Sequence, residues 1–182
     1  KIIADWAVQI SNEIISNDKL VLLIKKRENK YWYQQFRHFY AALSHAMQMI
    51  DLVRKYEKNA VDTFVDGIND YSKHLFKIDY AYRKFIYHFR ETNQNRVLLS
   101  LAEKMEKVYC NDWLLGWGNR WQKALDQEGK WFSLPKYTQQ RFFIDHVKPV
   151  VSKGQRLFVI ISDALRYECG WEYVQNIQQE KR

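Results

Sequence analysis

Residues 157–168 read LFVIISDALRYE, and the hydrophobic pattern of the chain changes here. The five apolar residues 157–161 follow one another without alternation, and Ser162 and Asp163 end the run. A continuous apolar run that is rich in β-branched residues and bounded by turn residues is typical of a strand buried on both faces. After Asp163 the apolar residues recur at helical intervals. The stretch therefore predicts a strand, an acidic turn and a helix, which together open an α/β domain.

Up to about residue 150 the apolar spacing is instead that of helices. Three stripes advance in steps of mostly three or four residues, which keeps each stripe on one helical face. They comprise Phe36, Tyr40, Leu43, Met47 and Ile50, then Tyr71, Leu75, Ile78, Tyr82, Phe85 and Phe89, and finally Leu98, Leu101, Met105, Val108, Trp113, Trp117 and Trp121. We therefore predict a mainly α chain. A multi-helix bundle should occupy residues 1–150, and the first β-strand and helix of a truncated α/β domain should occupy residues 151–182.

The predicted strand has no partner in this sequence. Each crossover between parallel strands takes a dozen or more residues. The other apolar run, residues 20–24, continues into a basic helical pattern, and the sequence ends at Arg182. The sequence also begins without Met or a targeting signal. We therefore expect an internal fragment of a longer protein.

Composition restricts the function classes. Almost half of the residues are apolar and 16% are aromatic, which excludes intrinsic disorder. No apolar stretch is long enough to cross a membrane, and Cys110 and Cys169 lack the spacing of a zinc site, so we expect a cytoplasmic protein with free thiols. The net charge is +8, but the basic residues are spread along the chain. DNA binding is therefore only weakly supported.

Asp163 is the candidate functional residue. It would stand at the carboxyl end of the predicted strand, where ligands gather in open α/β sheets. A carboxylate there suits a divalent cation, which takes oxygen ligands. The alternative is that Asp163 or Ser162 caps the following helix. The pattern by itself leaves both interpretations open.

Asp79 and Arg83 are candidates for a structural ion pair. They are four residues apart in a helical segment, with the acidic residue first, which is the favoured order. An exposed pair of this kind contributes only about 0.3–0.5 kcal/mol. If the pair is buried, removing Arg83 would leave a charge without compensation and cost roughly 3–5 kcal/mol.

Residues 157–168 closely resemble the opening of the PglZ domain, in particular that of the type A PglZ proteins of BREX bacteriophage-defence systems. Residues 78–85, IDYAYRKF, are similar to a D-x-x-Y-R-x-F pattern in the helical region that precedes this domain in the family. The resemblance implies an alkaline-phosphatase-like domain, and it favours the buried form of the Asp79–Arg83 pair. Members of the alkaline phosphatase superfamily hydrolyse phosphate esters or diesters with a metal pair, often zinc.

By this resemblance, Asp163 matches the first metal-binding aspartate of the family. Arg166 and Glu168 match the rest of the signature and are candidates for supporting the site. The nucleophile and the other metal ligands would lie beyond Arg182. We therefore expect a metal-dependent phosphatase or phosphodiesterase as the full-length protein. The fragment itself should be inactive and should hold no metal.

The resemblance also implies partners, which are the other subunits of a BREX defence complex. The cut strand at residues 157–161 could in addition pair with a second copy of the chain. The five histidines all lie in the helical region, and His38 and His45 share a face, which is ordinary for such residues. An alternative function is a helical scaffold that docks proteins or DNA and has no catalysis of its own.

Overall fold

The computed structural model describes residues 1–93, 95–128 and 138–180. The α-helices of this part are α1 (Ile2–Ser11), α2 (Asn17–Glu28), α3 (Tyr33–Tyr56), α4 (Phe64–Asp70), α5 (Phe76–Glu91), α6 (Leu99–Lys107), α7 (Gly116–Glu128), α8 (Lys148–Val151) and α9 (Tyr167–Glu180). The π-helical segments are Tyr71–Leu75, Val108–Leu115 and Phe143–Val147, and the 3₁₀ segments are Asn95–Leu98 and Gln139–Arg141.

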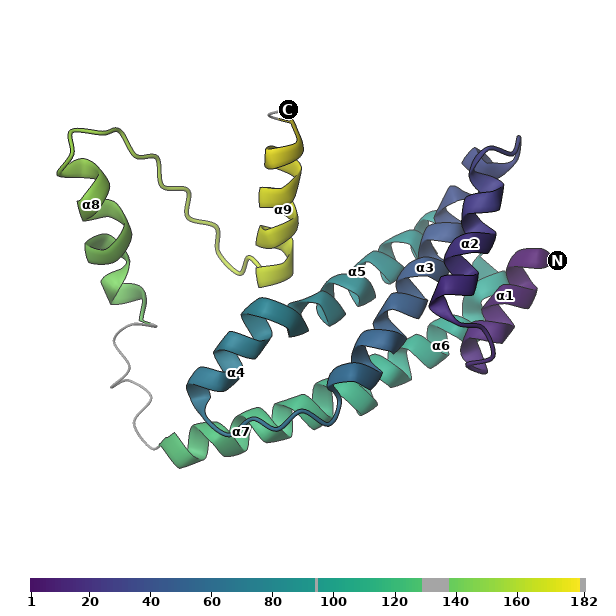
Figure 1. The fold of residues 1–182 in the computed structure, drawn as a ribbon, viewed down its shortest axis with the longest axis horizontal. Coiled ribbons are helices and arrows are strands. Elements are labelled where there is room, and N and C mark those ends of the chain that lie inside the picture. The colour runs from purple at the N-terminus through teal and green to yellow at the C-terminus, as the bar shows by residue number, and fades with distance from the viewer. Residues whose placement is uncertain (94, 129–137, 181–182) are drawn as a thin grey trace.

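Two of the π-helical segments join helices into long rods. The segment Tyr71–Leu75 connects α4 to α5, and Val108–Leu115 connects α6 to α7. Figure 1 shows these two rods side by side with α3, while α1 and α2 cover one end. The most extensive packing is between α3 and α5, and α4 also lies against α7. This arrangement confirms a mainly helical bundle, although α8 (Lys148–Val151), which the predicted range of 1–150 included, lies away from it (Figure 1).

Helix starts and ends follow local chemistry. Ser16 precedes α2, and its hydroxyl accepts a hydrogen bond from the backbone N–H of Lys19. Thr63 precedes α4 and caps it in the same way through the N–H of Asp66. Such caps satisfy N–H groups that have no partner within the helix. The two caps therefore fix where α2 and α4 begin.

The core is made by the apolar stripes. The largest apolar side chains that are less than 2% exposed are Ile10, Leu20, Leu43, Met49, Leu75, Ile78, Phe85, Leu98, Leu101, Met105 and Trp113. The rings of Trp113, Trp117 and Trp121 stack in sequence, with centroids 5.7 Å and then 6.3 Å apart. A Cβ atom at Gly67 would lie 2.2 Å from Cζ3 of Trp121, so glycine is what lets α4 approach α7 this closely.

The predicted strand at residues 157–161 is not formed. Residues 155–162 have neither helical nor strand structure, and the described ranges contain no β-strand. Phe158, Ile160 and Ile161 are each at least 86% exposed. A strand requires a neighbour for its backbone hydrogen bonds, and the part of the chain in view offers none. Figure 1 shows residues 138–166 leading away from the bundle and returning to it at α9.

None of the helices in the described ranges combines the length and the apolar character needed to cross a lipid bilayer.

Three histidines meet between α3 and α5, which the sequence did not predict. The Nδ1 atoms of His38 and His88 are 2.9 Å apart, and the rings of His45 and His88 stack with centroids 5.6 Å apart. Burial lowers the pKa of His88 to about 4, and the neighbouring His45, His38 and Lys84 act in the same direction. Burial also lowers the pKa of His45, while its contact with Gln48 opposes the change.

We expect this cluster to make the fold sensitive to acid. The folded-state pKa of His88 lies below its ordinary value of 6.5. Between pH 6.5 and pH 4 the unfolded chain therefore binds more protons, and stability should decrease as the pH falls. Thermal melts of the wild type should shift to lower temperature across this range, and the shift should be smaller for His88→Gln. The exposed His146 provides the control, because His146→Gln should behave like the wild type. An unchanged pH dependence in His88→Gln would contradict the assignment.

Candidate functional site

Asp163 is exposed and lies in the turn that leads into α9. It forms no hydrogen bond or ion pair with any residue that the structure describes. Helix α9 begins at Tyr167, and the backbone carbonyl of Arg166 accepts the first helical hydrogen bonds from Cys169 and Gly170. The interpretation of Asp163 or Ser162 as a helix cap is therefore wrong. The helix starts later than the signature predicted.

The residues in view do not by themselves form a metal site. Among the described residues, His, Cys, Asp and Glu side chains nowhere gather in a group of three or more suited to a metal ion. A single exposed carboxylate is too few ligands for a divalent metal. The role of Asp163 as a metal ligand stays a prediction.

Six charged side chains from α5, from the turn before α9 and from α9 face each other. They are Asp79, Arg83, Lys84, Arg166, Glu168 and Glu172, and we call these six residues the charged cluster. Three are acidic and three are basic, so their formal charges cancel. Asp79 and Glu168 are the buried members, and because buried charges are costly unless they are paired, the cations of the cluster offset the cost of placing them beneath α9.

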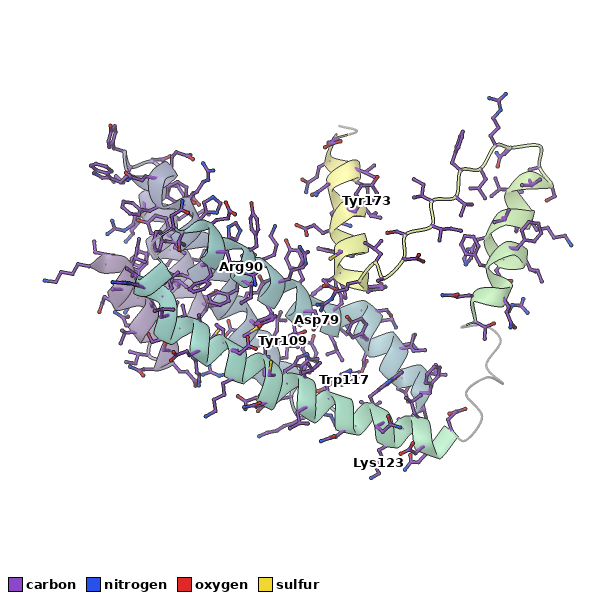
Figure 2. All side chains as sticks on the ribbon, turned by 180° about the vertical axis from the view of Figure 1, so that it is seen from behind. Asp79, Arg90, Tyr109, Trp117, Lys123 and Tyr173 are labelled. Carbon is purple, nitrogen blue, oxygen red and sulfur yellow. The ribbon has the colours of Figure 1, made fainter. Side chains whose placement is uncertain are left out.

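Asp79 is the buried acceptor of the cluster, with only 7% of its surface exposed. Its Oδ2 accepts a hydrogen bond of 2.6 Å from the hydroxyl of Tyr71, and its Oδ1 accepts one of 3.0 Å from Tyr109. Figure 2 shows Asp79 and Tyr109 lying close together between the two rods. Burial and the charge of Asp79 raise the pKa of Tyr109 to about 12, and burial together with the Asp79 hydrogen bond also raises the pKa of Tyr71. Both hydroxyls therefore remain donors at neutral pH.

Arg166 connects this acceptor to α9. Its Nη2 is 3.8 Å from Oδ2 of Asp79, and its Nε is 2.8 Å from Oε1 of Glu168. Glu168 is completely buried, and Nε of Arg83 lies 3.8 Å from the same oxygen. The other carboxylate oxygen of Glu168 has no hydrogen-bond partner within the described ranges. Glu168 therefore depends on two arginines for charge compensation.

Glu172 completes the charged cluster one helical turn further along α9. Its Oε1 is 2.9 Å from Nζ of Lys84, and its Oε2 accepts a hydrogen bond from Nη2 of Arg83. Burial raises the pKa of Glu172, but the hydrogen bonds from Arg83 and Lys84 outweigh this and hold it below its ordinary value. Glu172 is therefore ionised at neutral pH and pairs with both cations.

The predicted ion pair between Asp79 and Arg83 is not formed. Asp79 pairs with Arg166, whereas Arg83 pairs with Glu168 and Glu172. Both residues lie on α5 with the expected spacing, but each finds its partner outside the helix. The physical reason is that α9 and the turn before it place other charged groups around both side chains: Asp79 meets Arg166, and Arg83 meets two glutamates.

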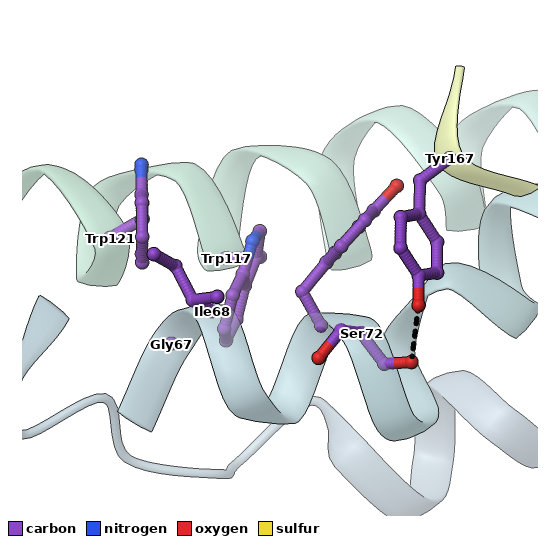
Figure 3. A pocket seen from close by; sticks show the side chains of 7 residues that line it. Gly67, Ile68, Ser72, Trp117, Trp121 and Tyr167 are labelled. Atoms are coloured by element: carbon purple, nitrogen blue, oxygen red, sulfur yellow. Dashed lines mark hydrogen bonds between the residues drawn. The ribbon is translucent and has the colours of Figure 1, made fainter. Parts of the chain in front are cut away.

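Aromatic contacts surround the charged cluster and also hold α9. Phe76 lies 5.2 Å from the ring of Tyr167 and 5.3 Å from that of Trp171, measured between centroids. The hydroxyl of Tyr167 donates a hydrogen bond of 3.1 Å to the backbone carbonyl of Ser72. Figure 3 shows this bond at one end of an apolar pocket of about 320 Å³. The pocket is lined by Gly67, Ile68, Tyr71, Ser72, Trp117, Trp121 and Tyr167.

The structure brings some predicted site residues together and leaves others apart. Arg166 and Glu168 contact each other and the helical bundle, whereas the carboxylate of Asp163 contacts neither of them. Sequence reasoning missed Glu172, although it lies four residues after Glu168 on the same helical face. It also missed Tyr71 and Tyr109, for which no local signal exists. Tyr71 lies in the π-helical segment that continues into α5, and Tyr109 lies in the π-helical segment of the other rod, so the two hydroxyls reach Asp79 from different rods.

Comparison with known proteins indicates the class of this chain. Residues 142–182 match the family model described as the BREX system PglZ alkaline phosphatase-like domain. The match contains the whole 157–168 signature and α9. The C-terminal part of the chain is thus similar to a domain described as alkaline phosphatase-like.

Two curated proteins extend the match into the helical bundle. The alkaline phosphatase-like protein PglZ of Bacillus cereus (strain H3081.97) is 32% identical over 179 residues, which cover 96% of this chain and 21% of that protein. The alkaline phosphatase-like protein BrxZ of Escherichia coli O9:H4 (strain HS) is 32% identical over 178 residues, which cover 88% of this chain and 20% of that protein. The chain therefore spans about a fifth of the length of these relatives. The matches confirm the resemblance to the PglZ family. No solved structure matches the chain.

Proposed function

We propose that this chain is the helical region and the beginning of the phosphatase-like domain of a PglZ-type protein that acts in bacteriophage defence. We further propose that the longer protein is a cytoplasmic, metal-dependent phosphatase or phosphodiesterase. The matches to PglZ and BrxZ over most of the chain support this proposal. One observation of the structure carries it furthest: the signature residues Arg166 and Glu168 are bound to Asp79 and Arg83 of the D-x-x-Y-R-x-F segment. The two segments that resemble the family thus meet in space.

The chain contributes a platform in this proposal. The bundle holds α9 through the charged cluster and leaves Asp163 exposed at the end of the irregular segment. We propose that a divalent metal, zinc by resemblance, binds in the longer protein and that Asp163 is one of its ligands. Because the described residues do not fit a metal pair, we assign no catalytic step to them. We expect the 182-residue chain to be inactive and not to bind zinc stoichiometrically, which isothermal titration of the chain with zinc would test.

The proposal is tested by a phosphodiesterase assay of the intact protein with and without added divalent metal. Asp163→Ala should abolish metal-dependent hydrolysis, because it removes a ligand without disturbing any contact within the described ranges. Asp145 is the matched control, since it is also exposed, lies in the matched region and, within the described ranges, pairs with Arg141 four residues away. Asp145→Ala should retain wild-type activity. Undiminished hydrolysis by Asp163→Ala would refute the assignment of Asp163.

A wild-type protein that shows no metal-dependent hydrolysis would instead favour the scaffold function. In that case the helical bundle would dock other proteins of the BREX system, or DNA. We propose BREX proteins as partners in either case, because the description of the matching family model names the BREX system.

The irregular segment predicts self-association of the chain when it is isolated. Phe158 and Ile160 are 87% and 86% exposed, and the backbone around them has no sheet partner among the described residues. Exposed apolar segments with free backbone groups tend to pair with other chains. Sedimentation velocity should show association that increases with concentration and that Ile160→Lys abolishes. A chain that stays monomeric at every concentration would contradict this prediction.

A further inference from the structure

The turn before α9 contains a residue in an unfavourable backbone conformation. Ala164 has a φ angle of 53°, in the left-handed region that residues with a Cβ atom rarely adopt. Such conformations persist where the surrounding structure determines them and offsets their free-energy cost. Asp163 directly precedes this residue. The direction in which its carboxylate points therefore depends on what holds the turn.

Arg166 is the side chain that holds the end of this turn. Its guanidinium lies between two carboxylates, Asp79 on α5 and Glu168 on α9. Its own carbonyl accepts the first hydrogen bonds of α9, from Cys169 and Gly170. One residue thus ends the turn, starts the helix and reaches back to the bundle. By contrast, Asp163 has no such contact within the described part of the chain.

Asp79 is suited to be the fixed end of this connection. Two tyrosine hydroxyls from the two π-helical segments bind one carboxylate oxygen each, so the group cannot rotate freely. It is buried, whereas the side chain of Arg166 is 54% exposed. The more rigid partner therefore sets the position of the more mobile one.

We propose that Asp79 is a positioning residue: through Arg166 it fixes the left-handed turn at Ala164 and hence the orientation of Asp163. The helical bundle would in this way determine the geometry of the signature of the neighbouring domain. The inference rests on the proposed function only for the role of Asp163 itself. The link between Asp79 and the turn is a property of this chain and requires neither metal nor substrate.

The proposal is tested on the 182-residue chain by NMR spectroscopy, with two readouts. The Cα and Cβ chemical shifts of Ala164 report its backbone conformation, and amide exchange at Cys169 and Gly170 reports the start of α9. In Arg166→Gln and in Asp79→Asn the shifts of Ala164 should move toward those of an extended residue, and exchange at both amides should become about tenfold faster or more. The two changes should not add, so the double variant should exchange about as fast as either single variant. Arg166→Lys, which keeps the charge but not the forked geometry, should restore part of the wild-type behaviour.

Three further measurements make the outcome decisive. Asp126→Asn, which removes an exposed carboxylate whose partner among the described residues is Gln122, is the matched control and should leave Ala164 unchanged. The resonances of Leu20, which is buried on α2 and remote in sequence from both substitutions, should stay constant in the folded variants. If Asp79→Asn does not fold, Arg166→Gln and Arg166→Lys still decide the question, because Arg166 lies outside the core. Unchanged Ala164 shifts in Arg166→Gln, or additive effects in the double variant, would overturn the proposal whether or not the intact protein is a hydrolase.

Discussion

Replacing Phe85 by alanine should lower the free energy of unfolding by about 3–5 kcal/mol. Phe85 is 0% exposed and lies on α5, which makes its most extensive contacts with α3. The substitution removes a large apolar side chain from a packed interface and leaves a cavity that the two helices cannot close fully. Since domains have total stabilities of only about 5–15 kcal/mol, a loss of this size affects folding of the whole chain.

Denaturation in urea, followed by circular dichroism at 222 nm, measures the effect. Phe158 is the matched control, because it is the same residue type but is 87% exposed. Phe158→Ala should change the free energy of unfolding by less than about 0.5 kcal/mol. Equal effects of the two substitutions would show that the core does not lie between α3 and α5.

Replacing Asp79 by alanine should cost roughly 2–4 kcal/mol, because it leaves two tyrosine hydroxyls without their acceptor. Tyr109 is 7% exposed, so its hydroxyl cannot readily turn to water. Tyr71 and Arg166 lose a partner as well, but both are closer to solvent. The cost should therefore come mainly from the buried Tyr109–Asp79 bond.

A double-mutant cycle isolates that bond. Tyr109→Phe removes the buried donor, so adding it to Asp79→Ala should cost less than the sum of the two single substitutions. Asp126→Ala, on the exposed side of α7, should stay within about 0.5 kcal/mol of the wild type. Strict additivity of Asp79→Ala and Tyr109→Phe would mean that the two side chains do not interact in solution.

The helical bundle was accessible from sequence because its signal is local and repeated. Leu43, Met47 and Ile50 lie on one face of α3, and Ile78 and Phe85 lie on one face of α5, whatever the partners of these faces are. Burying such stripes is the main favourable term in folding. When α3 and α5 pack against each other, the apolar stripes of both helices become buried. The π-helical segments gave no comparable signal, since a wider turn changes the spacing only slightly.

The prediction of a strand at residues 157–161 was wrong, because strand formation depends on more than the local sequence. A run of five apolar residues predicts burial, but burial as a strand requires hydrogen bonds to a second strand. The described residues supply none, so the run stays irregular and exposed.

Spacing along the chain was sufficient to place Asp79 and Arg83 on one helix and Arg166 and Glu168 in one signature. It was not sufficient to pair them, because an ion pair is decided by which charges are brought close and shielded from water. Docking of α9 on α5 exchanges the predicted partners, so that Asp79 meets Arg166 and Arg83 meets the glutamates of α9. These residues are more than eighty positions apart in sequence, and only the packing of the bundle makes them neighbours. Local periodicity thus determined the helices and their buried faces, whereas tertiary packing decided the contacts between α5 and the region of α9.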